Sequence, residues 1–278
     1  MKHPDHHFFL HIDRQKDIEP FQKALVGFDE QKITWLPRRN SHWGSMACVD
    51  VILDAFQTIQ RNGDFEYIVH LSGQDFPLFD MPTWRKQLSQ HSNTSYFFHF
   101  NLQDTRWKDG GSERLSTMQF FWFGKRKKIN AYTRNPFWKL VYKGWKRLLV
   151  NPVDQKHTYV GSEFYFIFHR DAVDRMLSNK RKFSWLSWRM SFVLIPEELY
   201  LSTMLMADPA AKPLTITNKT MRTIIWDMHS SSPKTLGWED LDALEADENW
   251  FARKFDFEQD ASFHQALLER ISRKSART

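Results

Sequence analysis

The sequence has very little of several residue types and patterns that define whole classes of protein. It holds one cysteine, Cys48, among 278 residues, so an intrachain disulfide and a cysteine-based zinc site are excluded. Neither GxGxxG nor GxxxxGK[ST] nor HExxH occurs, which argues against dinucleotide, P-loop and zincin chemistry. No run of 18 apolar residues and no apolar signal-peptide core is present. We therefore expect a protein of a reducing compartment, cytoplasmic and without a membrane-spanning segment.

The composition is otherwise that of a globular protein that can bury a large core. Apolar residues make up 41% and charged residues 26% of the chain. There are 12 Trp, 7 Tyr and 24 Phe, an excess that demands large buried surfaces or a groove lined with rings. No stretch rich in Gly, Pro or Ser separates two halves, so we expect one domain over residues 1–278.

Positive charge is concentrated in one segment. Lys and Arg number 39 against 33 Asp and Glu, for a formal net charge of +6. Residues 125–149 contain no acidic residue and nine basic ones, namely Lys125, Arg126, Lys127, Lys128, Arg134, Lys139, Lys143, Lys146 and Arg147. Without this segment the chain is slightly acidic, so a uniformly basic surface for nucleic acid is not indicated and no nucleic-acid partner is expected.

Short apolar runs alternate with helical patterns along the chain. Strands are predicted at 8–13, 33–36, 67–71, 95–100 and 164–169, and helices at 17–27, 44–62, 83–91, 171–177 and from Pro196 onward. The most secure helix is 44–62, where apolar residues follow helical spacing up to Gly63. Alternation of this kind favours an α/β fold with a parallel sheet and helices on both faces.

A few carboxylates stand out from the charged helical faces. Asp13, Asp75 and Glu198 each lie near a predicted strand end or helix start, where α/β proteins bind ligands. Asp240 and Asp242 form a D-x-D pair, a pattern by which sugar transferases hold a divalent cation. Their surroundings favour instead the acidic first turns of an amphipathic helix, where negative charge is stabilising. No metal site is predicted.

Several short words, taken together and in order, resemble the core-2/I-branching family, glycosyltransferase family 14. The likeness covers about residues 8–257, and the word around Ser72-Gly-Gln-Asp75 and the Pro-Glu-Glu word are the most specific. The words are Phe9-Leu-His-Ile-Asp13, Trp43-Gly-Ser45, Tyr67-Ile-Val-His-Leu-Ser-Gly-Gln-Asp-Phe-Pro-Leu78, Gly161-Ser162, Pro196-Glu-Glu198, Arg222, Ser232-Pro-Lys-Thr235 and Phe251-Ala-Arg-Lys-Phe-Asp256.

The resemblance implies a GT-A-like, Rossmann-type mixed sheet with helices on both faces, and inverting transfer of a sugar from a UDP-sugar to a hydroxyl. The family's catalytic base closes the Pro-[Asp/Glu]-Glu word, which corresponds to Glu198. A carboxylate with an ordinary pKa near 4.3 is charged at pH 7 and can accept the proton of the attacking hydroxyl. Glu197 is expected to point elsewhere, because adjacent helical residues do not share a face.

The resemblance also assigns the donor site. Members of the family work without a metal, and two cations meet the pyrophosphate, in positions that correspond to Arg222 and Lys254. Both side chains suit phosphate oxygens, Arg as a planar fork and Lys as a point charge. Asp13 corresponds to an aspartate that contacts the nucleotide, and Asp75 contributes site architecture or a contact to the donor sugar. No cofactor other than the UDP-sugar substrate is expected.

The resemblance is less specific about the donor sugar and the acceptor. N-acetylglucosamine transfer with β-1,6 branching onto a glycan or glycolipid is expected, and UDP-xylose-dependent O-xylosyl transfer is the alternative. Family members open with a strand and a helix ahead of the His-Ile-Asp strand. Only seven residues precede Phe8, so we expect this first strand–helix unit to be missing, either because the start codon is misassigned or because the protein lacks part of its uridine pocket. The single cysteine suggests a bacterial-type member, since animal members carry many disulfides.

The basic segment lies where the resemblance is weakest. From Pro136 to 149, Phe137, Leu140, Val141, Trp145 and Leu148 follow helical spacing with basic residues between them. One interpretation is a basic amphipathic helix that contacts anionic lipid on the inner face of the membrane. The other is a core-packed helix with a solvated basic edge.

Two readings outside the transferase class stay open. A non-enzymatic protein with a degenerate donor site would use the basic, aromatic segment to bind a membrane or nucleic acid. A glycoside hydrolase would need two carboxylates facing each other across a cleft.

Overall fold

The chain forms two compact units in a computed structural model that describes residues 6–102, 107, 111–122, 125–226, 232–258 and 260–276. The first unit comprises Met1–Glu66, His99–Phe164 and Arg170–Pro213. The second comprises Tyr67–Phe98, Tyr165–His169 and Leu214–Thr278. Each unit is thus assembled from three separate segments, and the division falls inside the two longest strands, β5 (Thr94–Asn101) and β8 (Val160–His169).

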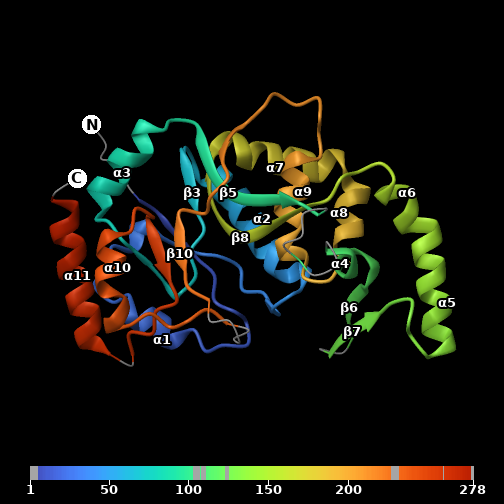
Figure 1. Ribbon diagram of the computed structural model, residues 1–278, viewed down its shortest axis with the longest axis horizontal. Coiled ribbons are helices and arrows are strands. Elements are labelled where there is room, and N and C mark those ends of the chain that lie inside the picture. The colour runs from blue at the N-terminus through green and yellow to red at the C-terminus, as the bar shows by residue number, and fades with distance from the viewer. Residues whose placement is uncertain are drawn as a thin grey trace. The chain divides into compact units, whose positions relative to one another are not determined.

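Helices are the predominant regular secondary structure of the first unit (Figure 1). The α-helices are α1 (Glu19–Ala24), α2 (Met46–Asn62), α4 (Ser112–Ser116), α5 (Pro136–Trp145), α6 (Asn151–Asp154), α7 (Arg170–Lys182), α8 (Ser184–Met190) and α9 (Tyr200–Met206). Two single 3-10 turns, η1 (Glu30–Lys32) and η4 (Pro196–Glu198), and a π-helical turn, η3 (Lys146–Val150), complete them. Helix α2 buries one face, which packs against α7 and η4.

The strands of the first unit form two pairs. β1 (Phe8–Leu10) runs parallel to β2 (Ile33–Trp35), and β6 (Met118–Trp122) runs antiparallel to β7 (Lys125–Ile129). β7 was not predicted, because four of its five residues are charged and only Ile129 is buried. Helix α5 packs against this hairpin through Tyr142 and Trp145.

In its described residues, the second unit combines short strands with three α-helices. The helices are α3 (Met81–Gln90), α10 (Leu241–Ala246) and α11 (Ala261–Ser275), with a 3-10 turn, η5 (Trp238–Asp240), ahead of α10. The strands are β3 (Tyr67–Val69), β4 (Asp75–Pro77), β9 (Thr215–Thr217), β10 (Arg222–Ile224) and β11 (Phe251–Arg253). A cluster of buried aromatic and aliphatic side chains, including Trp84, Trp250 and Phe251, forms its core.

The sheets mix parallel and antiparallel pairing. One has the order β10-β11-β4, in which β10 and β11 are parallel and β4 is antiparallel to β11. Another has the order β3-β8-β5-β9, in which β3 and β8 are antiparallel and β5 and β9 are parallel. The mixed α/β class and the mixed sheet are confirmed; the antiparallel pairs are the part that the alternation of strands and helices did not indicate.

Most predicted elements occur with small shifts at their ends. The helix predicted over 44–62 is α2, and the strands predicted at 33–36, 67–71 and 95–100 are β2, β3 and β5. The helix expected from Pro196 onward is interrupted: Pro196–Glu198 forms a 3-10 turn, and the α-helix begins at Tyr200. Within the described residues, no helix has both the length and the apolar character needed to cross a bilayer.

Candidate active site

The predicted site residues fall into two groups, one in each unit. Asp13 and Glu198 belong to the first unit, and Asp75, Arg222 and Lys254 belong to the second. Glu198 and Arg222 each follow a residue with a left-handed backbone within three positions. Ile195 (φ 53°) directly precedes the Pro-Glu-Glu turn, and Met221 (φ 52°) directly precedes Arg222. Such conformations in non-glycine residues cost about 1–3 kcal/mol and concentrate at functional sites.

Glu198 is an anionic group held by one cation. Its Oε2 atom lies 2.8 Å from a guanidinium nitrogen of Arg114, which comes from α4. The side chain of Glu198 is 31% exposed, so the carboxylate is paired without being sealed from solvent. Burial raises the pKa of Glu198, and the charge of Arg114 opposes that rise. The arrangement suits a carboxylate that accepts a proton from a bound hydroxyl.

Arg114 is itself positioned by aromatic rings. Its guanidinium lies 3.8 Å from the centroid of the Trp107 ring, which packs edge-on against Phe100 at 4.9 Å. Gly161 makes room for this stack: a Cβ atom there would lie 2.6 Å from the ring of Phe100. Gly111 does the same for Trp107, again with only 2.6 Å for a Cβ atom, and its φ of +72° favours glycine as well.

Glu197 has a different partner from Glu198 and joins two of the sequence words. Its Oε1 atom accepts a hydrogen bond of 2.7 Å from the backbone N–H of Gly44, in the Trp43-Gly-Ser45 word. The amide of Gln119 donates to the carbonyl of Gly44 from the other side. Glu197 is only 4% exposed, and burial raises its pKa to about 7. Glu197 is therefore a structural clamp on the loop that leads into α2.

Asp13 lies three residues beyond β1 and organises the loop around Ser41. It accepts hydrogen bonds from the N–H and the hydroxyl of Ser41, at 2.8 and 2.7 Å, and from the N–H of Gln15 at 2.8 Å. Although burial raises the pKa of Asp13, these hydrogen bonds outweigh it and hold the pKa below its ordinary value. Asp13 is therefore a carboxylate that stays charged across the neutral range.

Cys48 connects this loop with the Pro-Glu-Glu turn. Burial raises the pKa of its thiol to about 11, and the negative charges of Glu197 and Asp13 add to the rise. The N-terminal turn of α2 thus lies in the negative field of both carboxylates. The thiol stays protonated at neutral pH and is unsuited to act as a nucleophile.

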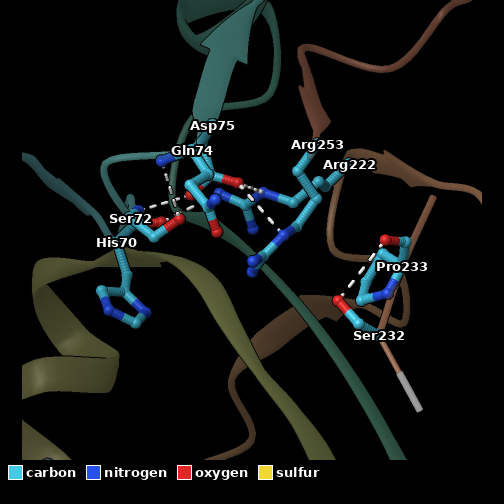
Figure 2. Close-up of polar contacts among 8 residues, drawn as sticks. All are labelled: His70, Ser72, Gln74, Asp75, Arg222, Ser232, Pro233 and Arg253. Atoms are coloured by element: carbon cyan, nitrogen blue, oxygen red, sulfur yellow. Dashed lines mark hydrogen bonds and ion pairs between the residues drawn. The ribbon is translucent and has the colours of Figure 1, made fainter. Parts of the chain in front are cut away.

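Asp75 is the centre of the second group (Figure 2). Its carboxylate is fully buried and lies 3.2 Å from Arg222 and 3.9 Å from Arg253. Its other oxygen accepts a hydrogen bond from the N–H of Ser72, and Arg222 also donates to the carbonyl of His70 at 2.9 Å. The Ser72-Gly-Gln-Asp75 word and the Arg222 word, distant in sequence, therefore meet here through charge.

Arg253 was not singled out by the sequence, which pointed to its neighbour Lys254. In the strand register, Arg253 lies opposite Asp75, and Arg222 lies opposite Phe251, two residues away on the same face of β11. Both guanidinium groups stack on the ring of Tyr165, at 4.2 and 4.6 Å. Recognition of residues 251–253 as a strand would have predicted this, because side chains alternate between faces.

Lys254 follows β11 directly. Its carbonyl accepts a hydrogen bond of 2.8 Å from the N–H of Leu236, which ties the segment after Ser232-Pro-Lys-Thr235 to β11. Its side chain forms no hydrogen bond or ion pair with any residue that the structure describes. Lys254 is therefore fixed through its backbone.

The D-x-D pair has the structural role that its context predicted. Asp240 ends η5, accepts a hydrogen bond from the N–H of Gly237 at 3.0 Å and binds the ammonium of Lys234 at 2.8 Å. Asp242 lies in the first turn of α10 and pairs with Arg270 at 3.1 Å. Both carboxylates are engaged by cations of the chain itself.

Comparisons with known proteins bear on the family. A search of curated proteins found no match to the chain. The family model described as Core-2/I-branching enzyme matches residues 1–248, which include both groups of site residues except Arg253 and Lys254. Because this match spans most of the sequence and agrees with the mixed α/β fold, the chain belongs to the Core-2/I-branching enzyme family of glycosyltransferases.

Proposed function

We propose that the protein is an inverting glycosyltransferase in which Glu198 is the catalytic base. The observation that carries the proposal is the pair formed by Glu198 and Arg114: a carboxylate that is partly open to solvent and paired with a guanidinium at 2.8 Å. Such a group accepts the proton of an acceptor hydroxyl as its oxygen attacks the anomeric carbon, while the nucleoside diphosphate departs from the opposite face.

The proposed donor is a UDP-sugar. UDP-N-acetylglucosamine with β-1,6 transfer is the first choice, and UDP-xylose is the second. Arg222 and Lys254 are assigned to the pyrophosphate, whose charge grows as the bond to the sugar breaks. Asp13 is assigned to the nucleotide, and Asp75 to holding the guanidinium of Arg222. Support comes from the ammonium group of Lys254, which forms no ion pair within the described chain, whereas Arg222 is buried against Asp75 in this structure.

The proposal includes catalysis without a metal, since two cations of the chain take over the charge of the leaving group. The test is the rate of UDP release with EDTA present and then with Mn²⁺ added. The rate should be the same in both conditions. A reaction that EDTA stops and Mn²⁺ restores would overturn this part of the proposal.

The reaction itself is tested by UDP release across a panel of UDP-sugars, with Glu198→Gln as the main variant. We expect a loss of about 10²–10⁴-fold in turnover, because the base is gone while the shape is kept. Binding of UDP, measured by calorimetry, should not change. Glu30→Gln, in the exposed turn η1, is the matched control and should be fully active.

Full activity of Glu198→Gln would refute the assignment of the base. The absence of UDP binding to the unmodified chain would favour the non-enzymatic alternative.

The proposed location is cytoplasmic and peripheral to the inner face of a membrane, with a glycan or glycolipid acceptor. A single cysteine suits a reducing compartment. The basic segment 125–149 supports contact with anionic lipid.

A further inference from the structure

Helix α5 and the turn η3 that continues it carry a stripe of apolar side chains on their exposed surface. Phe137, Leu140 and Leu148 are 64%, 72% and 72% exposed. They follow one another at spacings of three and eight residues, with Gly144 between, and so share one face of the helix. Three large apolar side chains on one face are in contact with solvent.

The stripe is not needed to hold the helix in place. A different face of α5, with Trp138, Tyr142 and Trp145, packs against the β6–β7 hairpin and Phe192. The start of the helix is fixed by Asn135, whose side chain accepts a hydrogen bond from the N–H of Trp138 at 3.1 Å. Helical spacing in the sequence groups Trp145 with Phe137 and Leu140 on one apolar face, whereas the structure buries Trp145 and leaves the other two exposed.

Unpaired positive charge lies beside the stripe. Lys139, Lys143, Lys146 and Arg147 are exposed, and within the described residues none of them forms an ion pair. Lys143 and Arg147 follow Leu140 by three and seven residues and therefore adjoin it on the helix surface. The neighbouring strand β7 adds Lys125, Lys127 and Lys128, which are also exposed, while residues 125–149 contain no carboxylate.

The combination of exposed apolar side chains and unpaired positive charge indicates which kind of partner this surface binds. The same face of a second copy of the chain would bring nine like charges against nine others, which is unfavourable. A nucleic acid would use the lysines and leave the two leucines in water. An anionic bilayer satisfies both features at once, because the apolar stripe enters the acyl boundary while the basic side chains reach the headgroups.

We propose that the stripe of Phe137, Leu140 and Leu148, with the adjoining lysines and arginine, is a docking surface for an anionic lipid bilayer. The proposal rests on the proposed function in one respect: docking would bring the transferase to an acceptor carried on lipid. Docking itself requires neither donor nor turnover. Vesicle binding can therefore fail while the transferase reaction succeeds, and the reverse.

The test is sedimentation of the full chain with phosphatidylcholine vesicles, with and without phosphatidylglycerol. The main variant replaces the stripe: Phe137→Gln, Leu140→Gln and Leu148→Gln together. Glutamine is a good helix former, so α5 should persist, which circular dichroism checks. The matched control replaces three exposed apolar residues of the same unit, Phe21→Gln, Val26→Gln and Phe28→Gln.

A charge variant separates the electrostatic contribution. It combines Lys139→Gln, Lys143→Gln and Arg147→Gln, and its control combines Lys16→Gln, Arg61→Gln and Lys212→Gln, three exposed cations elsewhere in the unit. We expect the stripe variant to lose about tenfold or more in partitioning, and the charge variant on the order of 100-fold at low salt. Both controls should bind as the unmodified chain does, and added salt should weaken all binding.

Three outcomes would overturn the proposal. The first is no binding of the unmodified chain to phosphatidylglycerol vesicles. The second is equal binding to neutral and anionic vesicles, and the third is a stripe variant that binds as well as its control. Light scattering without lipid tests whether the surface binds a second copy of the chain. Self-association that the stripe variant abolishes would identify a second copy as the partner instead of the bilayer.

Discussion

Replacement of Asp75 by asparagine should destabilise the protein strongly. Asp75→Asn keeps the shape of the side chain and removes the one carboxylate that Arg222 and Arg253 share among the described residues. At an effective dielectric constant of about 20, ion pairs at 3.2 and 3.9 Å correspond to attractions of about 5 and 4 kcal/mol. Desolvation of the three charges offsets part of this, and loss of one partner from a buried pair costs about 3–5 kcal/mol.

The assay is thermal and urea unfolding followed by circular dichroism. A loss of about 3–5 kcal/mol should lower the Tm by about 6–20 °C in a chain of this size. Asp242→Asn is the matched control: the same substitution removes an ion pair of 3.1 Å, but Asp242 is 89% exposed. An exposed pair contributes about 0–1 kcal/mol, so this variant should unfold almost as the unmodified chain does.

A second variant tests the cause. Adding Arg253→Met to Asp75→Asn removes one of the two guanidinium groups left without their carboxylate, and should recover part of the lost stability. If Asp75→Asn and Asp242→Asn unfolded at the same temperature, the argument from buried charge would be refuted. If the double variant were the least stable of all, buried positive charge left without its carboxylate would not be the reason for the loss.

Three further predictions concern the first unit. Arg114→Met should move the acid limb of the pH–rate profile to higher pH, because burial would then raise the pKa of Glu198 unopposed, whereas Arg114→Lys should restore much of the limb; a profile unchanged from that of a Lys182→Met control would contradict the pairing. Glu197 binds its proton more tightly when folded, with a pKa of about 7 against 4.5, so stability should fall as pH rises from 4.5 through 7, and Glu197→Gln should flatten this dependence in urea titrations; an unaltered slope would refute it. Gly161→Ala should cost about 1–3 kcal/mol in thermal unfolding, because the added methyl group meets the Phe100 ring, and a fully stable variant would speak against the stack.

Local patterns in the sequence predicted local structure well. Helix α2 was predictable because its buried residues repeat at helical spacing and Gly63 ends it. The 3-10 turn at Pro196–Glu198 was not, because it depends on the left-handed backbone of Ile195, which a β-branched residue before proline does not favour. Strand β7 was missed because a charged strand lacks the apolar alternation by which strands are recognised.

Contacts between segments far apart in the chain could not be predicted from the sequence. The resemblance to a family named Glu198, Asp75 and Arg222, yet nothing in it paired Glu198 with Arg114 or Arg222 with Asp75. Both pairs join segments far apart in the chain, and only the fold brings them together. Arg253 was overlooked for the same reason. Its position opposite Asp75 on β4 is set by the strand register, which the sequence does not reveal. The assignments of Lys254 and Asp13 to the donor stay predictions.

The interleaved segments of the two units have a consequence for any attempt to divide this enzyme. Because each unit takes three separate stretches of the chain, no single cut can release either of them whole. A protease that nicks one crossing would leave the two units joined by the other crossings, and a gene truncated after Pro213 would encode the first unit still carrying two segments of an incomplete second unit. Recombination with a relative would therefore have to exchange several segments at once, which makes this architecture resistant to shuffling by simple fusion.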